Sequence, residues 1–160
     1  FDQFMIGAYI PHYITAVAAI EIFRYPIWGF IIKKYGVIPI VRHKIKKAIG
    51  SLNLAEDAIM KGVSFLISPE GTRTLTGEIG PFKKGPFHLA KNTKATIVPI
   101  GLIGGFKAKK KSDWRVCPGI LRIKFGQPIK GDQFKDMEIK ELQNLVFNRI
   151  SRLVNGGGGI

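Results

Sequence analysis

The sequence predicts an α/β fold with a largely parallel central sheet flanked by helices. Short apolar runs of strand length alternate along the chain with longer segments whose apolar residues recur every three or four positions. This alternation is typical of a parallel sheet, because a crossover helix connects its parallel neighbours. Hydrophobic residues make up 46% of the 160 residues, which is enough for a sizeable core and excludes a disordered chain.

The first half of the chain is expected to contain three strands with helices between them. Pro11 should end the first helix, and Gly36 should end the third one after two lysines. Pro39 interrupts the second strand and has no N–H to donate, so this strand belongs at a sheet edge or at a bulge. The expected helices are 2–9, 21–25, 27–35 and 44–61, and the expected strands are 14–19, 37–41 and 63–67.

The second half is expected to add two strands and two helices. The strands are 95–100 and 119–125, and the helices are 85–91 and 137–154, the last with an apolar stripe at helical spacing. A basic loop, 106–115, lies between the two strands.

The net charge and the cysteine content limit the class of binding partner and the disulfide bonds that the chain can form. The formal net charge is +14, which indicates an anionic partner such as nucleic acid or an anionic membrane. Cys117 is the only cysteine, so a disulfide framework is excluded. We expect this residue to be a small core residue rather than a nucleophile.

A polar cluster follows the third expected strand. The apolar run 63–67 stops at Ser68 and Pro69, and Glu70, Gly71 and Arg73 come directly after it. The ends of buried strands are where α/β proteins place ligand sites. An arginine can hold a phosphate or carboxylate with two parallel hydrogen bonds. The alternative is a polar turn with a surface ion pair.

Two blocks carry a resemblance to a known family. Residues 68–73, SPEGTR, and residues 80–85, GPFKKG, resemble the PEGTR and FKxG motifs of the glycerophospholipid acyltransferases, typified by 1-acylglycerol-3-phosphate acyltransferase. The resemblance runs from Asp2 to about Pro128. It implies a glycerol-3-phosphate acyltransferase-like fold, with 1–154 as an acyltransferase domain that lacks its N-terminal part and 155–160 as a flexible glycine-rich tail.

The resemblance also implies an activity. The family transfers a fatty acyl group from acyl-CoA or acyl carrier protein, as co-substrate, to a hydroxyl of lysophosphatidate or a related lysophospholipid. Neither a cofactor nor a metal ion is expected. The implied localisation is at an anionic membrane surface, on the cytoplasmic face of the membrane. Nucleic acid is not an expected partner.

Asp2 is the implied catalytic residue. It resembles the aspartate of the family's N-H-x-x-x-x-D block, whose histidine acts as the general base toward the acceptor hydroxyl. That histidine would be encoded ahead of Phe1, so we expect the 160 residues alone to be almost inactive. Asp2 is equally suited to cap a helix N-terminus.

Basic and small residues from three further blocks are implied to bind the substrates. Arg42 and Arg73 are implied to hold the phosphate of the acceptor, and Glu70 to bind its glycerol phosphate. The complete implied set is Arg42, Glu70, Gly71, Thr72, Arg73, Lys83 and Pro99. A solvated basic helix start would equally explain Arg42, and a plain core strand would explain Pro99. Phe82 and Phe87 are expected in the core.

Three further possibilities remain open from the sequence. The cations and aromatic residues of 106–115 suit docking to an anionic bilayer, although a solvated loop is an equal alternative. The charge also allows a basic nucleic-acid-binding domain, but no RNP-like aromatic pair, zinc-finger spacing or helix-turn-helix pattern is found. A family member that has lost activity and only binds lipid is the remaining alternative.

Overall fold

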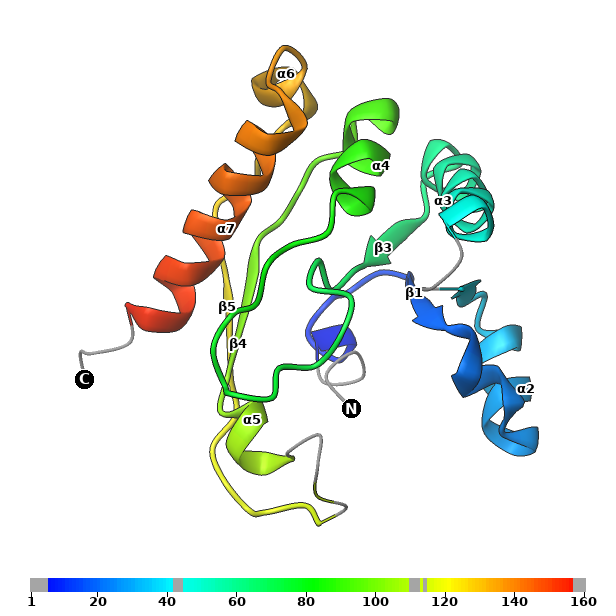
Figure 1. Ribbon diagram of the computed structural model, residues 1–160, viewed down its shortest axis with the longest axis vertical. Coiled ribbons are helices and arrows are strands. Elements are labelled where there is room, and N and C mark those ends of the chain that lie inside the picture. The colour runs from blue at the N-terminus through cyan, green and yellow to red at the C-terminus, as the bar shows by residue number, and fades with distance from the viewer. Residues whose placement is uncertain (1–5, 42–44, 110–112, 114, 157–160) are drawn as a thin grey trace. The chain divides into compact units, whose positions relative to one another are not determined.

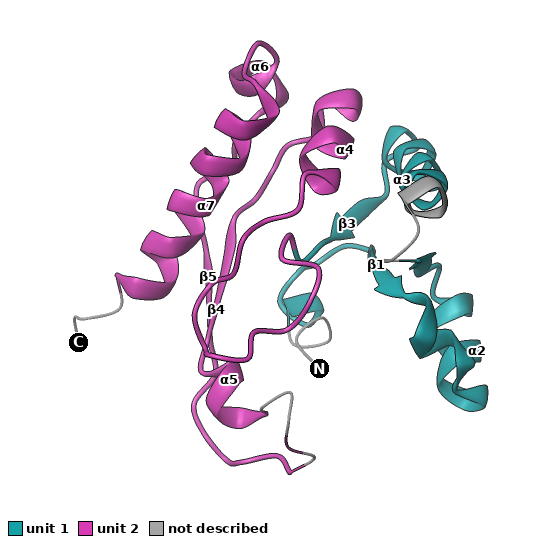
Figure 2. Ribbon diagram, in the orientation of Figure 1, with its two compact units in different colours: residues 1, 3–68 teal, residues 2, 69–160 magenta. Residues whose placement is uncertain are grey.

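The chain folds into two compact units, Gln3–Ser68 and Pro69–Ile160 (Figure 2). The structure is a computed structural model, and it describes residues 6–41, 45–109, 113 and 115–156. The boundary between the units falls inside the SPEGTR block, between Ser68 and Pro69. Each unit is described separately below.

Unit 1 is built on a parallel three-stranded sheet in the order β2-β1-β3 (Figure 1). The strands are β1 (Ile14–Ala19), β2 (Ile38–Ile40) and β3 (Ser64–Leu66). The central strand β1 is buried along its length except at Val17, as expected for a strand covered on both faces. Pro39 lies in the edge strand β2, opposite Ala18, so its missing N–H interrupts no further pairing within the described sheet.

Helices flank this sheet, as the sequence predicted. They are η1 (Ile20–Arg24), a 3-10 helix, followed by α2 (Pro26–Lys34) and α3 (Ile45–Met60). Helix α3 contacts β2 and β3. Gly29 of α2 approaches η1 closely, because a Cβ built there would lie 2.3 Å from the carbonyl oxygen of Phe23.

In its described residues, unit 2 combines a two-stranded antiparallel sheet with four helices. Strand β4 (Ile100–Ile103) pairs with β5 (Arg122–Phe125), Ile100 lying opposite Phe125. An isolated bridge between Ile97 and Ile129 continues this pairing. The helices are α4 (Gly85–Thr93), α5 (Gly105–Ala108), α6 (Gly131–Phe134) and α7 (Ile139–Asn155).

The core of unit 2 lies between α4, α6 and α7. The amphipathic α7 supplies Leu142 and Val146, which are 0% and 4% exposed. The helix starts with a capping interaction, since the Glu138 N–H donates to Glu141 Oε2 at 2.9 Å. The remaining core members are Phe82, Phe87, Ala90, Ile129 and Phe134. The prediction that Phe82 and Phe87 are core residues is confirmed.

The architecture confirms the predicted α/β fold class, with local differences. The sheet of unit 2 is antiparallel, and β5 begins at Arg122 rather than at the predicted residue 119. Residues 95–99, expected to begin the fourth strand, form only the single bridge at Ile97, and β4 starts at Ile100. Helices α5 and α6 were not predicted, because four residues are too few to show helical periodicity. Cys117 was expected in the core, but it is exposed, because it follows the basic loop rather than a core element.

The described helices include none that is long and apolar enough to cross a membrane. Helix α7 ends at Asn155, with Gly156 as its C-cap. The rest of the predicted glycine-rich tail, 157–160, lies outside the described residues.

Candidate functional site

The SPEGTR and GPFKKG blocks are joined by a loop, residues 69–83, that two hydrogen bonds close at its base. The Lys83 N–H donates to the carbonyl oxygen of Pro69 at 2.7 Å. The Gly80 N–H donates to Glu70 Oε2 at 2.8 Å. The two ends of the loop are therefore held side by side.

The tip of the loop is also held. Thr74 Oγ1 accepts hydrogen bonds from the N–H groups of Thr76 and Gly77, at 3.2 and 3.0 Å. Gly77 has a φ of +91°, and a Cβ placed on it would lie 3.0 Å from the ring of Phe106 in α5. The tip thus packs on Phe106, which gives this loop a defined shape despite its exposure.

Gly71 lets the chain turn directly after Glu70. Its φ of +70° lies in the left-handed region, which residues with a Cβ enter at a cost. A Cβ at this position would come 3.6 Å from Lys83 Cγ. The stem of Lys83 therefore runs beside the backbone of Gly71, so that the two motif blocks meet here.

Two cations of the loop are free to meet an anion. Arg73 and Lys83 are both exposed. Within the described ranges, neither side chain takes part in a hydrogen bond or ion pair. Thr72 lies between Gly71 and Arg73 and is exposed, with its Oγ1 3.5 Å from the carbonyl oxygen of Arg73. A guanidinium such as that of Arg73 can supply a bidentate fork to a phosphate, and an ammonium group such as that of Lys83 can supply a point charge.

Lys83 is positioned by the residue before it. The Phe82 ring stacks on Phe87 at a centroid distance of 6.2 Å and meets Phe147 of α7 edge-on at 5.2 Å. The carbonyl oxygen of Phe82 accepts a hydrogen bond of 2.5 Å from Nε2 of Gln143. The exposed lysine therefore follows a residue that is fixed in the core.

Sequence reasoning missed Gln143. This side chain is only 8% exposed, and its Oε1 is buried without a partner in the described part of the chain. The signal for it was present, because Gln143 occupies the apolar stripe of α7 between Leu142 and Val146. A polar residue on a core stripe usually has a specific partner.

The structure gives Pro99 a packing role. Pro99 is among the most completely buried side chains, and its carbonyl oxygen accepts the Gly126 N–H at 2.8 Å. These contacts join it to the start of β4 and the end of β5. None of the contacts described for Pro99 involves the 69–83 loop.

Two predicted site residues, Asp2 and Arg42, lie outside the described residues. The catalytic role of Asp2 and the phosphate-binding role of Arg42 therefore stay predictions.

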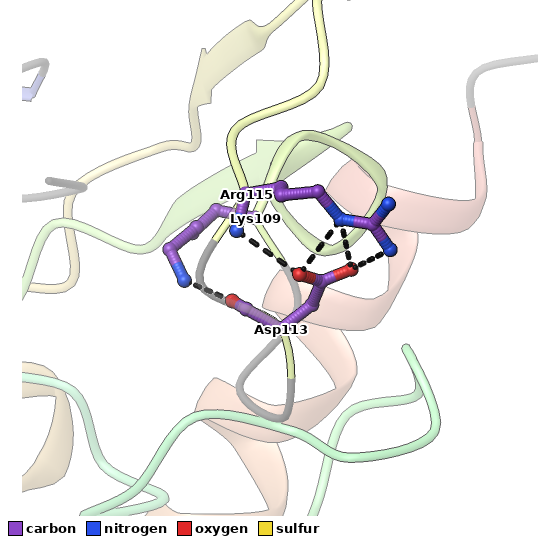
Figure 3. Close-up of polar contacts among 3 residues, drawn as sticks. All are labelled: Lys109, Asp113 and Arg115. Atoms are coloured by element: carbon purple, nitrogen blue, oxygen red, sulfur yellow. Dashed lines mark hydrogen bonds and ion pairs between the residues drawn. The ribbon is translucent and has the colours of Figure 1, made fainter.

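The basic segment, residues 106–115, is partly neutralised by its own carboxylate at Asp113 (Figure 3). Arg115 Nη2 lies 2.9 Å from Asp113 Oδ2, and Lys109 Nζ donates to the Asp113 carbonyl oxygen. Lys107 is exposed. A cavity of about 400 Å³ lies here, lined by residues 107, 113 and 115–118 and by none of the motif residues. Lys110, Lys111 and Trp114 lie outside the described residues.

Comparison with known proteins decides the family. The model of the Acyltransferase family matches residues 1–103, which include both motif blocks. The chain belongs to this family. The resemblance found in the sequence is thereby confirmed.

The named relatives of the chain agree with this family assignment. It is 35% identical over 146 residues to the 1-acyl-sn-glycerol-3-phosphate acyltransferase of Cocos nucifera, covering 91% of the chain and 47% of that protein. It is 37% identical over 102 residues to the enzyme of that name from Saccharomyces cerevisiae, covering 62% of the chain and 34% of that protein. The chain spans about half or less of the length of these relatives.

A solved structure supports the acyltransferase fold. The 1-acyl-sn-glycerophosphate acyltransferase of Thermotoga maritima superposes with a TM-score of 0.76, covering 89% of the chain and 56% of that structure. The sequence identity is 23%, so this likeness shows the fold alone.

Proposed function

We propose that the chain is the acyl-transfer part of a 1-acyl-sn-glycerol-3-phosphate acyltransferase in phospholipid biosynthesis. It moves a fatty acyl group from acyl-CoA or acyl carrier protein to the free hydroxyl of lysophosphatidate or a related lysophospholipid. The observation that carries this proposal is the pinned loop with Arg73 and Lys83, two exposed cations beside a glycine, in a chain of the Acyltransferase family.

The loop suits the phosphate of the acceptor. A phosphate monoester carries close to two negative charges, which a guanidinium fork and an ammonium group can match. Helix α4 begins at Gly85, just after Lys83 and Lys84, and its N-terminal dipole adds positive potential. The resemblance implies a second guanidinium for this phosphate, that of Arg42, which lies outside the described residues. Thr72 and Gly71 shape the turn in which Arg73 lies.

Glu70 has two roles in this proposal. Its Oε2 is engaged by the Gly80 N–H. Its Oε1 takes part in no hydrogen bond among the described residues, so it remains as an acceptor for a glycerol hydroxyl. The carboxylate would thus hold the loop and orient the acceptor together.

The reaction itself requires a base at the acceptor hydroxyl. The hydroxyl oxygen attacks the thioester carbonyl carbon, a C–O bond forms and the C–S bond breaks. The hydroxyl proton passes to the imidazole of the family's histidine and then to the leaving thiolate. Asp2 would orient that imidazole. No acyl-enzyme and no cofactor is needed, because the thioester is already activated.

Arg73 provides the test of this function. The full product of the gene is assayed with lysophosphatidate and either acyl-CoA or acyl carrier protein thioester, which also identifies the donor. We expect Arg73→Ala to raise the KM for lysophosphatidate at least tenfold without changing the KM for the donor. Arg73→Lys, which keeps the positive charge, should raise the KM for lysophosphatidate less. Arg152→Ala, which removes an exposed arginine from α7, is the control.

The 160 residues alone are tested by binding instead. Glycerol 3-phosphate is titrated and followed by the amide NMR signals of residues 69–83. We expect shifts in the parent chain that Arg73→Ala abolishes. Equal affinity of Arg73→Ala and parent would refute the phosphate role. Binding without any turnover by the full gene product would identify a lipid-binding member that has lost activity.

We also propose that the basic segment contacts the anionic surface of a membrane, on its cytoplasmic face. Both the acceptor and the product are amphiphiles, so the enzyme works at a bilayer. Lys107 is exposed, and each cation near an anionic surface contributes about 1 kcal/mol. The pairing of Arg115 with Asp113 reduces its share. Replacing Lys107, Lys110 and Lys111 by glutamate should weaken vesicle binding at low salt; unchanged binding would refute this contact.

A further inference from the structure

Helix α2 exposes an apolar face to solvent. Its buried residues are Gly29 and Ile32. Ile27, Phe30 and Ile31 lie on the opposite face by helical spacing, and they are 79%, 62% and 47% exposed. A surface helix normally turns such a stripe toward the core and leaves polar residues outside.

The exposed apolar surface continues at both ends of the helix. Tyr25 precedes α2 and Tyr35 follows it, and they are 65% and 52% exposed. Trp28 is 40% exposed, and Ile22 of η1 is 36% exposed. We call Ile22, Tyr25, Ile27, Trp28, Phe30 and Ile31 the α2 surface. Several large exposed apolar residues within one short segment, 22–31, are typical of an interaction site.

The charges around the α2 surface select an anionic partner. Within residues 20–35, the cations are Arg24, Lys33 and Lys34, and the one carboxylate is Glu21. Lys34 Nζ lies 5.2 Å from the centroid of the Phe30 ring. Aromatic residues at the boundary of an apolar patch, with lysine and arginine beside them, are typical of segments that lie in a membrane interface.

We propose that the α2 surface docks on an anionic lipid bilayer, with α2 in the plane of the interface and Ile27, Phe30 and Ile31 in its apolar part. The helix has nine residues, or about 14 Å, so it cannot span the ~30 Å hydrocarbon layer. This inference rests on the membrane contact proposed above and adds a second surface to it, in the other unit of the chain.

Vesicle binding of matched variants tests the proposal. Sedimentation with vesicles of phosphatidylcholine and phosphatidylglycerol should show at least tenfold weaker binding for Ile27→Ser/Phe30→Ser. The control Leu54→Ser/Met60→Ser removes two apolar side chains of similar exposure, 59% and 71%, from α3 of the same unit, and should bind within twofold of the parent. Circular dichroism verifies that each variant is folded.

The two tryptophans give an independent readout, and the variant that reports on Trp28 leaves the α2 surface unchanged. Trp114→Phe leaves Trp28 as the only tryptophan, and Trp28→Phe leaves Trp114. In the first variant we expect the emission to shift to the blue on vesicle addition and to be quenched by lipids brominated in their acyl chains.

The other possible results of these experiments each contradict one of the two proposed membrane contacts, or both. Vesicle binding with an unchanged Trp28 emission refutes the α2 surface, and a quenched Trp114 in that case leaves the basic segment as the docking site. A Trp28 shift that depends on protein concentration without lipid identifies a second copy as the partner and also refutes the proposal. No vesicle binding by the parent chain refutes both membrane contacts, while acyl transfer is still tested by Arg73.

Discussion

Glu70 is a motif residue that also has a structural role. The resemblance assigns it to the substrate, yet its Oε2 accepts the Gly80 N–H across ten residues of loop. Hydrogen bonds to a charged group are worth about 1.5–3 kcal/mol. A loss of activity on removing Glu70 would therefore not by itself reveal contact with the acceptor.

Stability measurements separate these two roles. Glu70→Ala should lower the free energy of unfolding by about 1.5 kcal/mol, since the Gly80 donor loses its partner, and Glu70→Gln by less than about 1 kcal/mol, since an amide oxygen replaces it. Urea unfolding followed by circular dichroism measures both. Glu78→Ala, on an exposed residue of the same loop, should change little. Equal stability of Glu70→Ala and the parent would leave only the substrate role.

Gly71 allows a second test at the level of a single residue. Gly71→Ala should cost about 1 kcal/mol, because the left-handed region is unfavourable for a residue with a Cβ, whereas the added Cβ itself meets only Lys83 Cγ at 3.6 Å. Gly119→Ala is the control, since its Cβ would enter open space. Thermal unfolding of the two variants compares them, and a neutral Gly71→Ala would show that the loop adapts.

The sequence could predict single residues whose role is local and not those whose partner is distant. The turn at Gly71 is local, because Ser68 and Pro69 end the apolar run and the glycine follows within three residues. The bond from Gln143 to Phe82 spans 61 positions, and no local pattern contains it. The prediction that Cys117 is buried was likewise wrong. Burial depends on which distant segment covers a residue, and the local sequence does not contain that information.

At the scale of elements, apolar periodicity located the long helices and the buried strands. Strand β1 spans the predicted residues 14–19, and α3 and α7 differ from the predicted helices by one or two residues at each end. Two four-residue helices escaped prediction, since one turn shows no period. The outward apolar face of α2 was also missed, because a stripe shows its spacing but not the side on which the core lies.

Two glycines inside helices of unit 1 should respond to alanine with opposite signs. Gly50→Ala in α3 should stabilise by about 0.5–1 kcal/mol, because alanine favours helices and no atom lies within 4 Å of the new Cβ. Gly29→Ala in α2 should destabilise by about 2 kcal/mol, because its Cβ would collide with the Phe23 backbone. Thermal melts measure both, and a stabilised Gly29→Ala would contradict the tight packing of α2 on η1.

At the scale of the whole molecule, the net charge of +14 attracts any polyanion. Charge alone therefore does not separate a membrane protein from a nucleic-acid-binding protein, which the sequence left open. Salt does, because only contacts between charges are screened. An apolar surface that enters lipid keeps its contribution when the charges are screened.

A salt series should accordingly distinguish the two partners. Binding to a single-stranded oligonucleotide should fall by a factor of about 10³ or more between 50 and 200 mM salt. Binding to anionic vesicles should fall far less, because the exposed side chains of α2 still enter the bilayer. Fluorescence titrations at each salt concentration provide the measurement. Oligonucleotide binding that resists salt better than vesicle binding would favour the nucleic-acid alternative.

Cys117 is exposed, and its N–H is tied to the carbonyl oxygen of Ala108 at 2.8 Å. It is the only cysteine of the chain. Under oxidising conditions, such a chain can be cross-linked into covalent pairs but never into longer polymers. The same thiol accepts one maleimide dye per molecule, two residues after the basic segment, without any engineered substitution.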